Sequence, residues 1–144
     1  MKVLVIGATG HTGTYLVPRL VLAGHEVCTI SRGKRKPYLP HSAWEKVTQI
    51  RIDQDQGDRS SAWINCVVDL APDVIVDMIC FKEESARRLV EALRGKLSHY
   101  LCCGTIWIHG HSVEVPTRED AAKSPICTQR KIARPHFRIA QNAQ

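Results

Sequence analysis

The sequence predicts an α/β fold in which about five strands form a doubly wound parallel sheet. Apolar runs of strand length alternate along the chain with segments of helical periodicity. A glycine-rich turn connects the first apolar run to the first helical segment. The spacing of these segments suits helical crossovers between parallel strands, which are right-handed in nearly all known proteins. Together the three observations favour a sheet with helices on both faces.

The expected elements follow one another in a regular order. The first strand is expected over Val3–Ile6 and the first helix over about Thr12–Ala23, with Gly24 at the helix end. The other expected strands are Glu26–Ser31, Thr48–Ile52, Val74–Cys80 and Tyr100–Cys103. The other expected helices are a short turn at Trp44–Val47, Asp58–Asp69 before Pro72, and Lys82–Leu93 before Gly95. Ligands of such sheets lie at the carboxyl ends of the strands, so we expect the site there.

Length and composition indicate one globular domain. The chain has 144 residues, of which 44% are hydrophobic and 24% charged, as is ordinary for a soluble protein. No apolar run reaches membrane-spanning length, and the first residues already form a core strand rather than a signal peptide. We therefore expect a cytoplasmic protein with a domain over residues 1–116 and a diverged basic tail over residues 117–144, in part disordered.

The six cysteines do not indicate a metal site. No two of them form a C-x-x-C pair, so a zinc ribbon is disfavoured and no metal is expected. Four fall in or beside apolar strand-like runs and are predicted to be buried thiols rather than ligands or disulfides. These four are Cys28, Cys80, Cys102 and Cys103.

Positive charge is concentrated in two places. The net charge is +6, and the tail carries much of it. The second concentration follows the second strand and contains Arg32, Lys34, Arg35 and Lys36. One interpretation of this run is a solvated surface loop, and the other is a binding site for a phosphate.

The glycine turn is typical of a site for the pyrophosphate of a dinucleotide. Gly7 permits a tight turn, Gly10 lets the backbone approach the phosphates, and Gly13 allows close packing of helix on strand. The start of the helix then offers free N–H groups and the positive end of its dipole to the anion. The alternative is a tight turn that holds no ligand.

Several segments resemble the extended short-chain dehydrogenase/reductase family, the NAD(P)-dependent sugar-nucleotide epimerases and dehydratases. GATGHTG resembles the nucleotide fingerprint of that family, VIVDMICF its fourth strand, and HYLCCGTIWIHG with VPTRED its fifth strand and following loop. The resemblance implies a Rossmann fold and nucleotide binding. It also implies a C-terminal substrate domain, which we do not expect within these 144 residues, so a nucleotide-sugar substrate is expected only if such a domain is supplied.

The resemblance implies a set of cofactor-binding positions. NAD-binding relatives carry an acidic residue at the end of the second strand, but here Ser31 stands in its place and Arg32 follows, which favours NADP over NAD. Asp53 matches an adenine-contacting residue, although its spacing equally fits a turn. The remaining positions are Thr9, His11 and Thr12 in the glycine turn, and Met78, Ile79 and Cys80, for which plain core burial is the alternative.

The catalytic positions of the family are only partly matched. The family uses a Ser or Thr after the fifth strand, where Thr105 stands, and a Tyr-x-x-x-Lys pair. The best register for that pair retains Lys131 but puts Cys127 in place of the Tyr, and a thiol has a much shorter reach than a phenol. Pro135 would interrupt the helix that carries the pair. We therefore expect a cofactor-binding protein that is truncated and catalytically impaired.

Two other functions remain open from the sequence. The basic charge is compatible with a non-catalytic regulatory or RNA-binding module, although only Phe137 among the aromatic residues lies near the basic tail, so nucleic acid is not the expected partner. The other expectation is a homodimer, either through the fifth strand or its neighbour as a sheet edge or through the tail.

Overall fold

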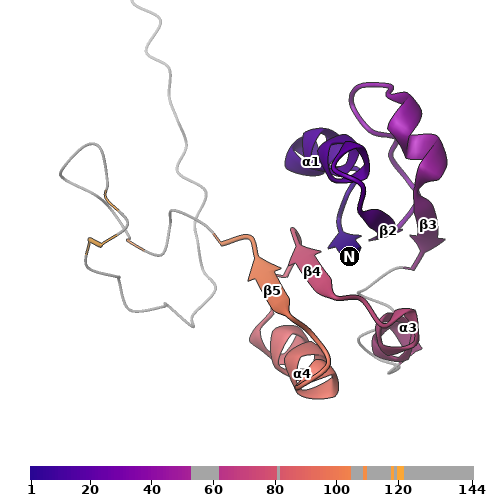
Figure 1. Ribbon diagram of the computed structural model, residues 1–144. Coiled ribbons are helices and arrows are strands. Elements are labelled where there is room, and N and C mark those ends of the chain that lie inside the picture. The colour runs from indigo at the N-terminus through magenta and orange to yellow at the C-terminus, as the bar shows by residue number, and fades with distance from the viewer. Residues whose placement is uncertain (53–61, 81, 105–108, 110–117, 119, 122–144) are drawn as a thin grey trace, which may run out of the picture. The chain divides into compact units, whose positions relative to one another are not determined.

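Five parallel strands form a single sheet (Figure 1). The computed structural model describes residues 1–52, 62–80, 82–104, 109, 118 and 120–121. The order across the sheet is β3-β2-β1-β4-β5, which confirms the predicted doubly wound topology. The strands are β1 (Lys2–Ile6), β2 (Glu26–Ser31), β3 (Thr48–Arg51), β4 (Val74–Asp77) and β5 (His99–Cys102).

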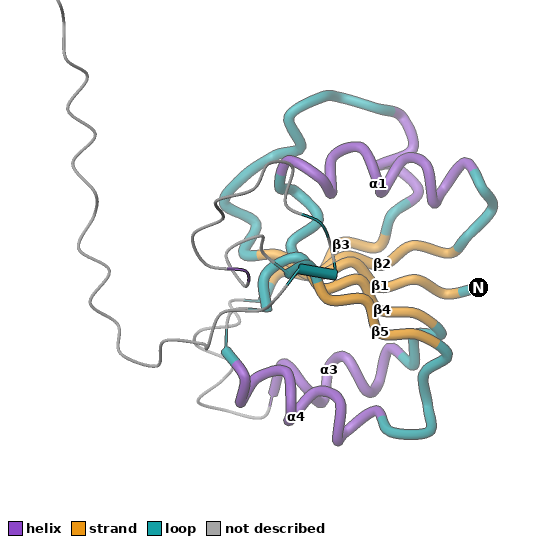
Figure 2. The backbone as a smooth tube through the Cα atoms, turned by 90° about the vertical axis from the view of Figure 1, so that its left-hand side faces the viewer, coloured by secondary structure: helices purple, strands orange, loops and turns teal. Residues whose placement is uncertain are grey.

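Helices cover both faces of the sheet (Figure 2). Helix α1 (His11–Leu22) lies on one face, and α3 (Ala62–Leu70) and α4 (Glu83–Leu93) lie on the other. A short 3₁₀ helix, η1 (Ser42–Lys46), contacts α1. Side chains of a strand alternate between faces, and β1 serves both cores. Val3 and Val5 pack in the α1 cluster, whereas Leu4 and Ile6 pack with α3 and α4.

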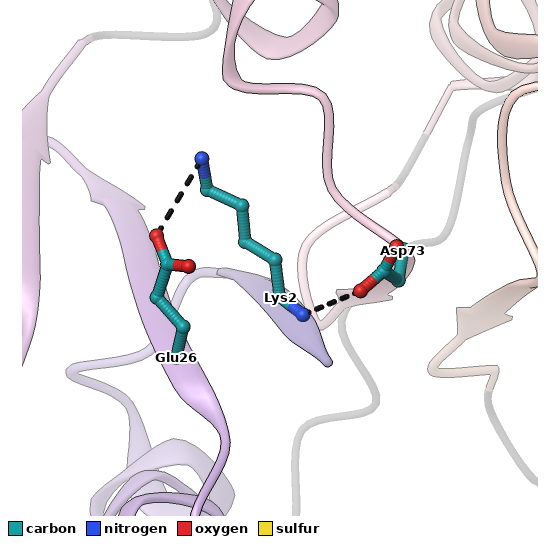
Figure 3. Close-up of polar contacts among 3 residues, drawn as sticks. All are labelled: Lys2, Glu26 and Asp73. Carbon is teal, nitrogen blue, oxygen red and sulfur yellow. Dashed lines mark hydrogen bonds and ion pairs between the residues drawn. The ribbon is translucent and has the colours of Figure 1, made fainter.

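The sheet is also tied together at the amino ends of its strands (Figure 3). The backbone N–H of Lys2 in β1 donates to Asp73 Oδ2 at 2.6 Å, just before β4 begins. The ammonium group of Lys2 lies 3.5 Å from Glu26 Oε1 in β2. Lys2 therefore links three neighbouring strands, β1, β2 and β4, at their amino ends.

The structure corrects two predictions from the sequence. Strand β4 ends at Asp77, so Met78–Cys80 lie outside it, although they continue its apolar run. The thiols are also less buried than expected. Cys28 is buried in the core, but Cys80 is half-buried and Cys102 is exposed, as is Cys103. The reason is that β5 is an edge of the described sheet, so its far side lacks a neighbouring strand.

The chain divides into two units, Met1–Cys103 and Gly104–Gln144. All the helices and strands above belong to the first unit. In the second, the Arg118 guanidinium lies 3.2 Å from Asp120 Oδ1, and the Ala121 N–H donates to the Arg118 carbonyl. Each helix in the described parts of the chain is too short or too polar to cross a lipid bilayer.

Candidate functional site

The turn after β1 requires glycine at its first position. Gly7 has a φ of +81°, in the left-handed region that side chains disfavour. A Cβ on Gly7 would also lie 2.8 Å from Ile79 Cγ2, which follows β4. The Gly7 N–H donates to the Ile30 carbonyl of β2 at 2.9 Å. The turn is therefore fixed at the point where the carboxyl ends of β1, β2 and β4 meet.

The third glycine is required by close packing. A Cβ on Gly13 would lie only 2.1 Å from the carbonyl oxygen of Ala8, a backbone atom that cannot simply move aside. The first turn of α1 therefore packs directly against the chain leaving β1. Gly10 is less crowded, because a Cβ there would lie 3.3 Å from the Gly7 carbonyl oxygen.

The start of α1 is arranged to receive an anion. Gly10 is the N-cap and provides no capping side chain, and the first turn contains no acidic residue. The N–H groups at a helix start have no partner within the helix and lie at the positive end of its dipole. His11, Thr12 and Gly13, all predicted from the fingerprint, form this first turn. Such an arrangement suits a phosphate or pyrophosphate group.

A groove of about 260 Å³ lies beside this turn. Its lining includes six of the predicted cofactor-binding residues, namely Gly7, Thr9, Gly10, Ser31, Arg32 and Ile79. Lys34 and Arg35, from the basic run after the second strand, line it as well. The structure therefore brings together residues from the ends of β1, β2 and β4, as expected for ligand sites in this type of sheet.

Five lining residues were not named as site residues from the sequence, namely Ile6, Ile30, Gly33, Ile52 and Trp63. Ile52 directly follows β3, where the rule that ligands lie at strand carboxyl ends places the site. Trp63 lies near the start of α3 and is 1% exposed. Its contribution depends on how α3 packs against the sheet, for which the local sequence carries no signal.

The loop after β2 gives the groove a positive border. The Ser31 hydroxyl accepts a hydrogen bond from the Gly33 N–H at 3.3 Å, which turns the chain directly after the strand. The side chains of Arg32, Lys34 and Arg35 are exposed around this turn. A second cavity, of about 610 Å³, also borders Ser31 and Arg35 and adds the cations Lys36 and Arg51. The described lining of both cavities contains no acidic side chain.

The Thr14 hydroxyl connects the loop after β2 to the start of α1. Thr14 Oγ1 donates to the Gly10 carbonyl at 2.9 Å and accepts a hydrogen bond from the Tyr38 N–H at 3.1 Å. The imidazole of His11 lies edge-on to the Tyr38 ring, with centroids 5.8 Å apart. The basic loop and the helix start therefore form one continuous border of the site.

Asp77 shapes the other side of the groove. This side chain is 1% exposed, and its Oδ1 accepts a hydrogen bond from the Ile79 N–H at 3.0 Å. That bond turns the chain out of β4, which explains why the strand is shorter than predicted. Burial raises the pKa of the Asp77 carboxyl, although hydrogen bonds from Ile79, Tyr100 and Cys80 act in the opposite direction.

The three predicted residues after β4 are not equivalent. Ile79 lines the groove, and Met78 lies close to Gly7, whose added Cβ would be 3.4 Å from Met78 Cβ. The Cys80 thiol instead approaches the Lys82 carbonyl at 3.8 Å. Four other predicted residues lie outside the described part of the chain: Asp53, Thr105, Cys127 and Lys131. Among the described residues, no group of three or more His, Cys, Asp or Glu side chains could hold a metal ion.

Residues 3–133 match the NAD dependent epimerase/dehydratase family. A 2'-dehydrokanamycin reductase from Streptomyces kanamyceticus is 27% identical over 126 residues, which cover 88% of this chain and 34% of the reductase. A candidate epimerase from Burkholderia cenocepacia is 26% identical, with a TM-score of 0.67, over 86% of this chain and 44% of that one.

The fold is also similar to that of UDP-glucose 4-epimerase from Bifidobacterium longum, whose solved structure contains NAD⁺ and UDP. The TM-score is 0.69 at 15% identity, over 86% of this chain and 43% of the epimerase. The chain thus spans less than half the length of each of these three relatives.

Proposed function

Because the chain belongs to the NAD dependent epimerase/dehydratase family, we propose that it binds a nicotinamide dinucleotide in the groove beside the glycine turn. The pyrophosphate would lie at the start of α1, against the N–H groups that follow Gly10. The observation that carries the proposal is the uncapped start of α1 beside a groove whose described lining includes Gly7, Gly10 and Arg32 and no acidic side chain.

We further propose that the dinucleotide is NADP rather than NAD. The adenosine ribose would lie near Ser31, at the end of β2. A carboxylate there would repel a 2'-phosphate, whereas Arg32 can donate two charge-assisted hydrogen bonds to it. Lys34 and Arg35 add positive charge to the same border. The solved epimerase that contains NAD⁺ leaves this choice open for the present chain.

Calorimetric titration of the whole chain with NADPH and with NADH tests both proposals. We expect saturable binding of each dinucleotide, with NADPH the tighter ligand. Gly10→Leu, checked for folding by circular dichroism, should abolish binding of both. If neither dinucleotide binds at millimolar concentration, the proposed function is wrong. If NADH binds as tightly as NADPH, only the preference is wrong.

The chemistry of this chain is proposed from its sequence. A bound dinucleotide would accept or donate a hydride. Thr105 and Lys131 occupy family positions for binding the reacting oxygen and the ribose, but Cys127 replaces the Tyr that would move the proton. We propose that the chain alone binds cofactor but turns over little or no nucleotide-sugar. Robust hydride transfer to such a substrate by the purified chain would overturn this proposal.

The expected homodimer stays a proposal as well. Strand β5 is an edge of the described sheet, and Leu101 within it is 51% exposed. An unpaired parallel edge can accept another strand. Sedimentation velocity should find a dimer that Leu101→Lys converts to a monomer, and a wild-type monomer would argue against the proposal.

A further inference from the structure

A cluster of polar side chains lies at the carboxyl ends of β4 and β5. Asp77 is paired in register with Cys102, and Ile75 with Tyr100. Residues paired across parallel strands share a face of the sheet, and so do residues two apart along one strand. Asp77, Tyr100 and Cys102 therefore lie on the same face, the one covered by α3 and α4. The hydrogen bond from the Tyr100 hydroxyl to Asp77 Oδ2, 3.0 Å long, agrees with this placement.

The chain after β4 brings a second thiol to this cluster. The N–H groups of Ile79 and Cys80 both donate to the Asp77 carboxylate, which bends the chain back over the strand end. As a result, Cys80 lies at the same end of the sheet as Tyr100 and Cys102, and it raises the pKa of both groups. The two thiols thus come from the ends of neighbouring strands and lie close together.

Accessibility and position together distinguish this pair from the other described cysteines. Cys102 is exposed and Cys80 is half-buried, so a small solute can reach them. Cys28 is buried in the core and Cys66 lies on α3. Cys103 is exposed too, but it lies just beyond the end of β5, and the register of the two strands pairs Cys102 rather than Cys103 with Asp77.

We propose that Cys80 and Cys102 are an oxidisable dithiol, which a peroxide converts to an intramolecular disulfide. The thiolate of one cysteine attacks an oxygen of hydrogen peroxide, and the O–O bond breaks. Hydroxide departs, and the attacking cysteine becomes a sulfenic acid. The other thiolate then attacks that sulfur and expels a second hydroxide. With the two thiol protons, one peroxide and two thiols give one disulfide and two waters.

The experiment treats the whole, dilute chain with hydrogen peroxide and maps its tryptic peptides without reduction. Peptide Ser60–Lys82 carries Cys66 and Cys80, and Leu97–Arg118 carries Cys102 and Cys103. We expect these two peptides to be linked, with a mass lower by two hydrogen atoms. Because each carries two cysteines, matched serine variants are needed to assign the bond.

The link should be lost in Cys80→Ser and Cys102→Ser and kept in the neighbouring controls, Cys66→Ser and Cys103→Ser. A link that persists in Cys102→Ser, or oxidation that adds oxygen without any link, would overturn the proposal. A second measurement needs no peptide assignment. The oxidised wild type should unfold at higher urea than the reduced protein, because the bond constrains the unfolded chain, and Cys102→Ser should lack this shift. Neither readout depends on dinucleotide binding.

Discussion

The Tyr100 hydroxyl donates a 3.0 Å hydrogen bond to Asp77 Oδ2, and thereby connects an edge strand of the sheet to a buried carboxylate of its neighbour. The other oxygen of Asp77 holds the N–H of Ile79, a residue of the groove. Burial, Asp77 and Cys80 all raise the pKa of the Tyr100 hydroxyl, so it stays protonated and remains a donor. The carboxylate therefore connects β5 to the wall of the candidate site.

Replacing Tyr100 by Phe tests this connection. The variant leaves Asp77 Oδ2 buried without its side-chain donor, and we expect the free energy of unfolding to fall by about 1–3 kcal/mol. Urea unfolding measures the change. Tyr15→Phe is the matched control, since Tyr15 is 52% exposed and its loss of a hydroxyl should change stability little. Equal stability of the two variants would contradict the role given to the hydrogen bond.

The raised pKa of Asp77 predicts a specific pH dependence. The native state holds the Asp77 proton more tightly than the unfolded chain does. This contribution to stability is therefore complete below the unfolded pKa of about 3.9 and is lost as pH rises through the native pKa. Asp77→Asn removes it, so the stability of the variant relative to wild type should increase as pH rises through this window. Parallel pH profiles of the two proteins would show the prediction to be wrong.

The packing of Gly13 predicts a large cost for the smallest substitution. Gly13→Ala would push a methyl group into the Ala8 carbonyl, and we expect the free energy of unfolding to fall by about 3 kcal/mol or more. Gly24→Ala is the control, because nothing lies within 4 Å of its added Cβ. Only its φ of +82° is unfavourable for alanine, so the free energy of unfolding should fall by about 1–2 kcal/mol. Urea unfolding ranks the two. A Gly13 variant as stable as the Gly24 variant would mean that the helix start can shift outward at little cost.

The position of Arg32 predicts that the chain binds NADPH more tightly than NADH. If its guanidinium binds the 2'-phosphate, Arg32→Ala should weaken NADPH binding about tenfold, equivalent to about 1.4 kcal/mol, and leave NADH binding unchanged. Calorimetry with each dinucleotide measures this. Arg19→Ala removes the same charge from an exposed position on α1 that borders neither cavity, and should alter neither affinity. An equal loss for both dinucleotides would assign Arg32 to a contact other than the 2'-phosphate.

Much of the fold could be predicted because its signals are local. Strand β2 was predicted to the residue, and the register of glycines correctly indicated where β1 gives way to α1. The end of β4 was predicted wrongly because Met78–Cys80 continue an apolar run. The strand ends because the Asp77 side chain accepts hydrogen bonds from the N–H of Ile79 and from the hydroxyl of Tyr100, 23 residues away. Apolar periodicity contains no information on such a contact.

The candidate site shows the same division. Thr9, Ser31 and Arg32 line the groove because they lie at or just after strand ends, which the sequence reveals. Trp63 lines it because of how α3 packs, and the exposure of Cys102 follows from the place of β5 at an edge of the described sheet. Both facts depend on the arrangement of whole elements, which no single stretch of residues specifies.

The two hydrogen bonds of Thr14 Oγ1 have a consequence for recognition. They hold the backbone at Tyr38, within the basic loop, to the first turn of α1 before any ligand arrives. The conformational entropy of that part of the loop is thus lost during folding rather than during association. An anion that reaches the groove meets a preorganised border, so more of its contact energy is retained as affinity.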